Sequence, residues 1–324
     1  MALPSASPSA RVALGRRRLS DRIGDRAFVL LSGAAALAAL VLVGLIAYEL
    51  LREAWPAMQE FGLSFVTGRV WDPVTNQFGA LDFIYGTLYT SFLAVLLAGP
   101  LAIAIALFLT ELAPRGVRGL IGTLVELLAA IPSVVMGLWG IFVLGPIVRD
   151  HIGPALQSVL GWTPFFKGTP QITGYLTASL VLTIMILPIT ASVARELFRT
   201  VPQDLKEASL ALGMTRWEMI RGVVVPYTRG GLVAAVILGL GRALGEAIAV
   251  LQTVGGTLGI SLSQFANGDT LASRIAAQYQ GATSNLQVSS LVYLAVILLA
   301  ISLVTNLAAQ IIVRRFEFQR TGGS

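Results

Sequence analysis

Six long apolar segments constrain the fold of this chain more than any other feature of its sequence. They cover residues 27–51, 86–110, 120–148, 174–194, 230–252 and 289–313. A helix of about 20 residues crosses the roughly 30 Å apolar core of a bilayer, so each segment is long enough to span it. The segments lack the alternation of apolar and polar residues typical of barrel strands. The sequence therefore predicts an all-α membrane protein with six transmembrane helices, in which Pro132 and Pro188 are tolerated inside the third and fourth helices.

The composition argues against a soluble enzyme and against several kinds of site. Charged residues make up 12% of the 324 residues, whereas a soluble domain carries roughly 25%. The chain has no cysteine and a single histidine, His151, so it cannot form a disulfide framework, a cysteine nucleophile or a multi-histidine metal site. We therefore expect neither a metal site nor a catalytic site.

The first apolar segment differs from a signal peptide in its length. It follows a basic flank that contains Arg16, Arg17, Arg18, Arg22 and Arg26. Its run of about 25 apolar residues exceeds the roughly 7–15 residues of a signal-peptide core. We interpret it as an uncleaved first helix that follows a basic N-terminal segment, residues 1–26.

The distribution of basic residues predicts the orientation of the chain. Counted over the connections, one side carries 17 of the 23 Lys and Arg residues and the other side carries five. Positively charged connections remain in the cytoplasm. Both termini are therefore expected in the cytoplasm, which agrees with an even number of spans.

The connection formed by residues 195–229 carries strong signals of local structure. Pro202 suits the first turn of a helix, and Gly213 is placed to end that helix in a left-handed conformation. Thr215 and Glu218 have capping-box spacing, which predicts a second short helix, and Pro226 is expected to end it. This helix, glycine turn and helix could lie on lipid headgroups or dock on a cytoplasmic partner. A nucleic-acid-binding role is disfavoured because both ends are tethered to membrane spans.

The same connection resembles a motif of bacterial ABC importers. The permease subunits of binding-protein-dependent importers carry the pattern E-A-A-x3-G-x9-I-x-L-P, and the spacing from Glu207 to Pro226 matches it in full. The matching positions are Glu207, Ala208, Ser209, Gly213 and Pro226, with departures at Ser209, Val223 and Val225. The resemblance implies a six-helix permease whose cytoplasmic coupling helix docks in a groove of an ATPase subunit.

Three further segments narrow the resemblance to the phosphate-importer permease subunits. They are residues 52–80, 126–140 and 240–250, and the similarity extends from about residue 20 to 316. It implies a second homologous permease subunit, two cytoplasmic ATPase subunits and an extracytoplasmic phosphate-binding protein as partners, in the bacterial inner membrane. Neither lysine of the chain follows a glycine as a P-loop requires, so ATP is expected to be used by the partner and no cofactor by this chain.

The resemblance also implies a division of the chain into four regions, and several other functions have to be compared with that of a phosphate permease. The expected regions are the basic segment 1–26, the first helix and extracytoplasmic loop 27–85, a five-helix permease core 86–313 and a cytoplasmic tail 314–324. A permease for sulfate or molybdate and the second channel subunit of the phosphate importer remain alternatives. A passive channel has no need of a docking element, and an intramembrane enzyme lacks its motifs here.

Two charged residues lie within the fifth apolar segment. Arg242 is about 12 residues into it, and a buried arginine costs roughly 2.5–3.5 kcal/mol on insertion scales. Glu246 follows four residues later, which on a continuous helix is one turn along the same face. One interpretation places Arg242 and Glu246 on the substrate path, as the resemblance implies, with the planar guanidinium binding phosphate. The other interpretation is a structural pair between two subunits. A further charge, Glu126, is expected inside the third span and pairs with a neighbour or reaches the interface.

Overall fold

The computed structural model describes residues 19–321. The beginning of the predicted basic segment, residues 1–18, and the end of the predicted tail, residues 322–324, lie outside the described residues. The chain divides into two units at Glu49, and each unit is described by itself. The first unit contains most of α1 (Leu19–Phe61), a single 43-residue helix.

Six helices within residues 19–321 are long and apolar enough to cross a membrane, which confirms the predicted all-α membrane fold. The candidate spans are Ala27–Phe61, Leu81–Leu112, Ser133–Leu160, Tyr175–Arg199, Arg216–Leu244 and Asn285–Val313. Pro188 lies inside the fourth span without breaking it. The second, fourth and sixth spans agree with the apolar segments of the sequence to within a few residues.

Short α-helical and π-helical segments join end to end within several spans. The elements of the second unit are α2 (Ser64–Thr67), β1 (Trp71–Asp72), β2 (Gln77–Phe78), α3 (Leu81–Leu107), α4 (Arg115–Ala129), α5 (Ser133–Trp139), α6 (Gly145–Ile147), α7 (Gly153–Leu160), α8 (Tyr175–Arg199), α9 (Gln203–Ala211), α10 (Arg216–Met219), α11 (Val225–Leu244), α12 (Ile248–Thr253), α13 (Leu271–Gln278) and α14 (Asn285–Thr321). Turns of π-helix cover Phe108–Leu112, Gly140–Leu144, Val148–Ile152 and Ile220–Val224, and 3-10 turns cover Pro164–Phe166 and Tyr279–Gly281.

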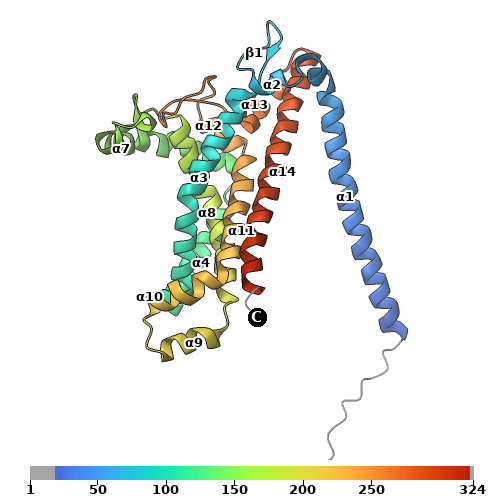
Figure 1. Ribbon diagram of the computed structural model, residues 1–324. Helices are drawn as coiled ribbons and strands as arrows, with labels where there is room; N and C mark the ends of the chain where they lie inside the picture. Colours follow the sequence, from blue (N-terminus) through green and yellow to red (C-terminus); the bar gives the residue numbers. More distant parts are fainter. Residues whose placement is uncertain (1–18, 322–324) are drawn as a thin grey trace, which may run out of the picture. The chain divides into compact units, whose positions relative to one another are not determined.

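Helix α8 lies at the centre of the second unit. In its most apolar stretch 67% of the residues are buried, against 28–33% for the other four spans of this unit. It packs against α3 and α11, and α11 in turn packs against α14. Figure 1 shows α9 and α10 at one end of this bundle and α13, α2 and β1 at the other. We call these the α9 end and the α13 end.

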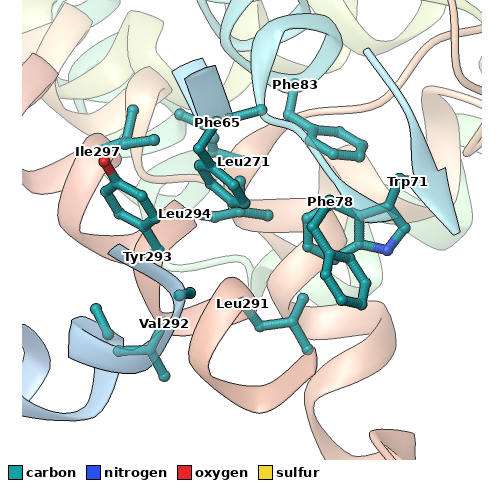
Figure 2. Packing of buried hydrophobic residues seen from close by; sticks show 13 residues of the cluster. Phe65, Trp71, Phe78, Phe83, Leu271, Leu291, Val292, Tyr293, Leu294 and Ile297 are labelled. Carbon is teal, nitrogen blue, oxygen red and sulfur yellow. The ribbon is translucent and has the colours of Figure 1, made fainter. Parts of the chain in front are cut away.

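An aromatic cluster closes the α13 end of the bundle. The antiparallel strands β1 and β2 pair Trp71 with Phe78, and both rings pack with Phe83, Leu271 and the first turns of α14 (Figure 2). The ring of Phe65 stacks on that of Tyr293 with centroids 4.4 Å apart. Because these side chains come from six separate elements, the cluster joins the connections at this end into one packed body.

The third span differs from the prediction. The apolar segment 120–148 is not one helix, because α4 ends at Ala129 and a new helix begins at Ser133. Pro132 disfavours a helical conformation at the residue before it and its ring clashes with an earlier carbonyl, so the helix stops rather than kinks. Helix α4 is instead a separate amphipathic helix, and the span continues to Leu160, beyond the predicted end at residue 148.

The fifth span also differs from the prediction, which placed one helix over residues 230–252. Helix α11 ends at Leu244, residues 245–247 are not helical, and the short α12 follows. Irregular backbone at membrane depth persists only where protein buries it or where it lines a water-filled space. The break therefore marks a special position in the bundle.

Candidate transport path and coupling element

The predicted helix, glycine turn and helix of the connection after α8 are confirmed. Pro202 precedes α9, and Gly213 has φ +87°, a conformation that most residues avoid. At the start of α10 the Glu218 backbone N–H donates to Thr215 Oγ1 and the Thr215 N–H donates to Glu218 Oε2 at 2.8 Å. Together these form the capping box that the spacing indicated.

The extent of the connection and the place of Pro226 differ from the prediction. Helix α8 runs on to Arg199, and a continuous helix extends from Arg216 to Leu244. Pro226 therefore lies in the first turn of α11 and does not end a helix. The π-helical turn before it changes the hydrogen-bond pattern where proline offers no N–H. The connection shrinks from residues 195–229 to about 200–215.

Helix α9 has a buried side and an exposed side. Ser209 is 5% exposed and its hydroxyl donates to the Lys206 carbonyl at 2.7 Å. Glu207 and Ala208 are exposed, and Gln203 donates to Glu207 at 3.2 Å. The exposed surface of α9, the turn and α10 includes five large apolar residues beside polar ones such as Asp204 and Arg216. The five are Leu205, Leu210, Leu212, Met214 and Trp217. We call these five residues the apolar patch.

Sequence reasoning missed an ion pair that fixes the buried side of α9. Lys206 Nζ lies 2.6 Å from Glu111 Oε1, and the side chains are 12% and 9% exposed. Glu111 belongs to the π-helical turn that ends the second span. The sequence signal was a glutamate just after the second apolar segment and a lysine in the loop after the fourth, and spacing cannot pair residues so far apart along the chain.

Arg242 lies in the last turn of α11, near mid-depth of the bundle. Helix α11 faces Leu197 of α8 at Gly231 and faces Thr190 at Gly239. Because the two helices run antiparallel, Arg242 lies level with the middle of the 25-residue α8. The cation also lies at the negative end of the helix dipole, which is a favourable position.

The structure does not bring Arg242 and Glu246 together as one helical turn. Glu246 lies in the break after Leu244 and is half-buried, whereas Arg242 is exposed and follows Ala234 and Leu238 along the open side of α11. Neither side chain makes a hydrogen bond or an ion pair with the residues that the structure describes. An intrahelical pair is therefore wrong as an explanation for these charges.

Glu126 is not inside a span, contrary to expectation. It lies on α4, where its side chain is 61% exposed and accepts from Arg195 of α8 at 2.9 Å. The break at Pro132 removes α4 from the third span, and this puts Glu126 at the α9 end. Glu126 therefore pairs with a neighbouring residue, which was one of the two expectations.

The α13 end holds a second buried ion pair that the sequence did not reveal. Arg274 Nη2 lies 2.6 Å from Asp269 Oδ2, with side chains 11% and 4% exposed, and the guanidinium stacks on Phe83. Burial raises the pKa of Asp269, against the opposing effect of Arg274. Nearby, the Leu271 N–H donates to Thr87 Oγ1 at 2.9 Å and fixes α13 to α3. Within the described part of the chain no group of three or more His, Cys, Asp or Glu residues could hold a metal ion.

Comparison with known proteins identifies the family. Residues 98–318 match the family described as the inner membrane component of binding-protein-dependent transport systems. This chain belongs to that family. Members of the family are transport components, which agrees with a membrane protein that has no expected catalytic site.

Curated relatives in this family match almost the whole chain. The phosphate transport system permease protein PstC of Mesorhizobium japonicum is 44% identical over 99% of this chain and 98% of its own length. A protein of the same name from Haemophilus influenzae is 42% identical over 87% of this chain and 90% of its own length. The resemblance inferred from the motifs is therefore confirmed.

Solved structures of two other transporters share the fold. A bacterial alginate ABC transporter in complex with an alginate-bound periplasmic protein aligns with TM-score 0.59 and 18% identity, over 90% of this chain and 96% of that one. An inward-facing methionine ABC transporter aligns with TM-score 0.58 and 19% identity, over 76% of this chain and 99% of that one. At these identities the likeness concerns the fold alone.

Proposed function

We propose that this chain is a channel-forming subunit of an ATP-driven inorganic phosphate importer. The observation that carries the proposal is Arg242, an exposed guanidinium without a described partner, at mid-depth on the open side of α11. Intramembrane charges usually face a bundle interior or a water-filled path. Relatives named as phosphate transport permeases over nearly the whole chain support phosphate as the solute.

The orientation proposed for the bundle follows from its charges. The α9 end lies in the cytoplasm and the α13 end outside, with both termini cytoplasmic, because the basic residues concentrate in the connections of the first side. The membrane is the bacterial inner membrane.

The partners are assigned by the surfaces that this chain leaves open. The apolar patch around Trp217 docks on a cytoplasmic ATPase subunit, with Glu207 and Ala208 on the same exposed side and Gly213 shaping the turn. Ser209 lies on the buried side of α9, and Pro226 lies at the start of α11. Each importer has two such ATPase subunits, which use the ATP, and this chain binds no cofactor.

The open side of α11 is assigned to a second homologous permease subunit. The phosphate path then runs between the two subunits, and an extracytoplasmic phosphate-binding protein delivers the anion to it. Arg242 offers two parallel N–H donors to the oxyanion. Glu246 lies close in sequence and lowers the net charge of the empty path, so that phosphate is not retained.

Substitution of Arg242 tests this proposal. We expect Arg242→Lys to reduce labelled-phosphate uptake, because an ammonium keeps the charge but loses the bidentate geometry. Arg242→Gln removes both and should reduce uptake about tenfold or more. The control is Arg69→Gln, which changes an exposed arginine next to β1 at the α13 end of the bundle. Uptake is measured in cells with matched amounts of the assembled transporter.

Three outcomes would contradict the proposal. Equal uptake by Arg242→Lys, Arg242→Gln and the unmodified protein would remove Arg242 from the path. Uptake of sulfate or molybdate in place of phosphate by the unmodified transporter would assign the chain to another oxyanion importer. Normal uptake after exchange of the two charges, with Glu at 242 and Arg at 246, would make them structural.

A further inference from the structure

One buried ion pair connects α9 with two membrane helices. The Lys206 ammonium lies 2.6 Å from Glu111 Oε1 and 3.5 Å from the Phe198 carbonyl oxygen. Glu111 lies at the end of the second span, and Phe198 lies in the last turn of α8. A single side chain of the coupling element therefore contacts the ends of both helices.

Two other cations described near the pair, Arg118 and Arg199, have partners other than Glu111. A pocket of about 380 Å³ adjoins the pair and is lined also by Arg118 and Arg199. Arg118 donates to the backbone carbonyls of Thr110 and Ala113, and Arg199 pairs with Glu196 at 2.9 Å. Among the side chains that the structure describes, Lys206 is the cation paired with Glu111.

The pair is a polar contact between the buried side of α9 and the membrane helices, beside the packing of α9 on the π-helical turn Ile220–Val224. Lys206 and Ser209, three residues apart, form the buried side of α9, and the residues between and beside them are exposed. Glu111 belongs to a π-helical turn, and such turns are frequent at functional sites. Below the pair, Ala106, Phe198 and Val224 pack in one apolar cluster that joins the second, fourth and fifth spans.

An ion pair is a poor choice if its purpose is stability alone. Well-packed apolar residues of similar volume usually hold a buried site at least as well, because no charge has to be desolvated. What an ion pair adds is direction and a defined partner, which suits a contact that must keep its register while an element moves.

We propose that Glu111 and Lys206 are positioning residues that transmit the movement of α9 to the second and fourth membrane helices during transport. This rests on the proposed function, in which α9 docks on the ATPase. Loss of the pair then leaves ATP hydrolysis intact but separates it from opening of the path.

The test uses the complete transporter reconstituted in proteoliposomes, with all subunits and the full chain. The main variant is the double substitution Lys206→Met with Glu111→Leu, which removes the pair without leaving a buried unpaired charge. Its companion exchanges the charges, Lys206→Glu with Glu111→Lys. The matched control is Glu126→Gln, which alters the exposed ion pair between α4 and Arg195 at the same end. Three quantities are measured: the yield of assembled complex, ATP hydrolysis with and without phosphate-loaded binding protein, and phosphate moved per ATP hydrolysed.

We expect the apolar double variant to assemble and to keep its basal ATP hydrolysis. Stimulation of ATP hydrolysis by loaded binding protein should fall about tenfold, and so should the amount of phosphate moved per ATP hydrolysed. A change of this size is typical of coupling between two sites. The exchanged pair should recover most of this loss, and Glu126→Gln should behave as the unmodified protein does.

Two results would overturn the proposal. Normal phosphate moved per ATP in the apolar double variant would reduce the pair to packing. Failure of that variant to assemble, while the exchanged pair assembles, would make the pair a folding requirement. An unmodified transporter that responds only to a binding protein loaded with another solute would contradict the phosphate function, and the same ratio measured with that solute would still decide the role of the pair.

Discussion

The two ends of the helix bundle fix their connections in different ways, although each uses a buried ion pair of 2.6 Å. At the α13 end, Asp269 and Arg274 are five residues apart within one connection, and the aromatic cluster of Figure 2 covers the site. At the α9 end, Glu111 comes from the end of the second span and Lys206 from the connection after α8. The outer side there exposes Leu212 by 83% and Trp217 by 67%.

This difference concerns how each end uses its large apolar side chains. The α13 end buries an aromatic cluster within its own elements, although Leu63 and Val74 stay exposed there by 84% and 90%. The α9 end places its polar contact inside and its apolar patch outside. Contiguous exposed apolar residues mark a surface that another protein covers. The ion pair between Glu111 and Lys206 is one of the contacts that join α9 to the bundle.

Accessibility to a thiol reagent should give an all-or-none contrast between the ends. The chain has no cysteine, so single cysteines can be introduced at exposed Val74 beside β1 and exposed Thr200 before α9. Because the α13 end is proposed to lie outside, a membrane-impermeant reagent should label Val74→Cys in intact cells. It should label Thr200→Cys only after the cells are opened. Labelling of Thr200→Cys in intact cells would reverse the proposed orientation.

Breaking the ion pair of the α13 end should cause the largest change in stability. Arg274→Met leaves Asp269 buried without its cation, which costs about 3–5 kcal/mol. The control is Arg149→Met, which breaks an Arg–Asp pair whose side chains are 47% and 46% exposed and should change stability little. Thermal unfolding of the purified complex measures both. Equal midpoints for the two variants would mean that burial does not distinguish these pairs.

Removing Trp217, the aromatic residue of the apolar patch, should weaken assembly of the transporter without destabilising the chain. Trp217→Ala is expected to cost roughly 2 kcal/mol of binding to the ATPase subunit, as for an aromatic interface residue. Trp162→Ala is the matched control, because Trp162 is 80% exposed in the connection before α8. Co-purification of the ATPase subunit measures the effect. A similar loss with both variants would show that the contrast between the ends does not concern docking.

The smallest expected effect is a pH dependence of opposite sign at two aspartates of the α13 end. Burial raises the pKa of Asp269, so the folded state binds that proton more tightly than the unfolded state does. Its contribution to stability therefore falls as pH rises from 3.8 through the raised folded value, and it returns as pH falls. Hydrogen bonds from Thr75 and Val74 lower the pKa of exposed Asp72. Its contribution is present above 3.8 and is lost as pH falls through the lower folded value.

The unfolding midpoint measured against pH should separate the two aspartates. Asp269→Asn should remove the component that weakens with rising pH, and Asp72→Asn the component that weakens with falling pH. Curves that shift in the same direction for both variants would contradict the assignment of burial as the dominant influence on Asp269.

Local signals in the sequence predicted local structure well. The six spans follow from runs of apolar residues that are long enough to cross the apolar core of a bilayer. The turn at Gly213 and the capping box of Thr215 with Glu218 are decided by backbone conformation and hydrogen bonds within a few residues. The same kind of reasoning was wrong at Pro226, because a π-helical turn allowed the helix to continue.

Contacts between distant segments could not be predicted. The sequence showed a glutamate after the second apolar segment and a lysine in a loop, and nothing in their spacing joined Glu111 to Lys206. It also gave Arg242 and Glu246 the spacing of one helical turn, whereas the helix ends between them. Helix breaks inside an apolar segment depend on which neighbours can bond the freed backbone groups, and those neighbours come from elsewhere in the chain.

The sequence by itself determined the number of membrane helices, the asymmetry of charge between the two sides and the local geometry of the coupling element. Each of these depends on residues close together or on transfer from water to lipid, which acts on every segment separately. The break in the third span has a local cause in Pro132. The tertiary structure alone decided the break after Leu244, which charges meet and which side of α9 stays exposed. Those outcomes depend on packing between helices, where a buried charge must find a partner that chain order does not specify.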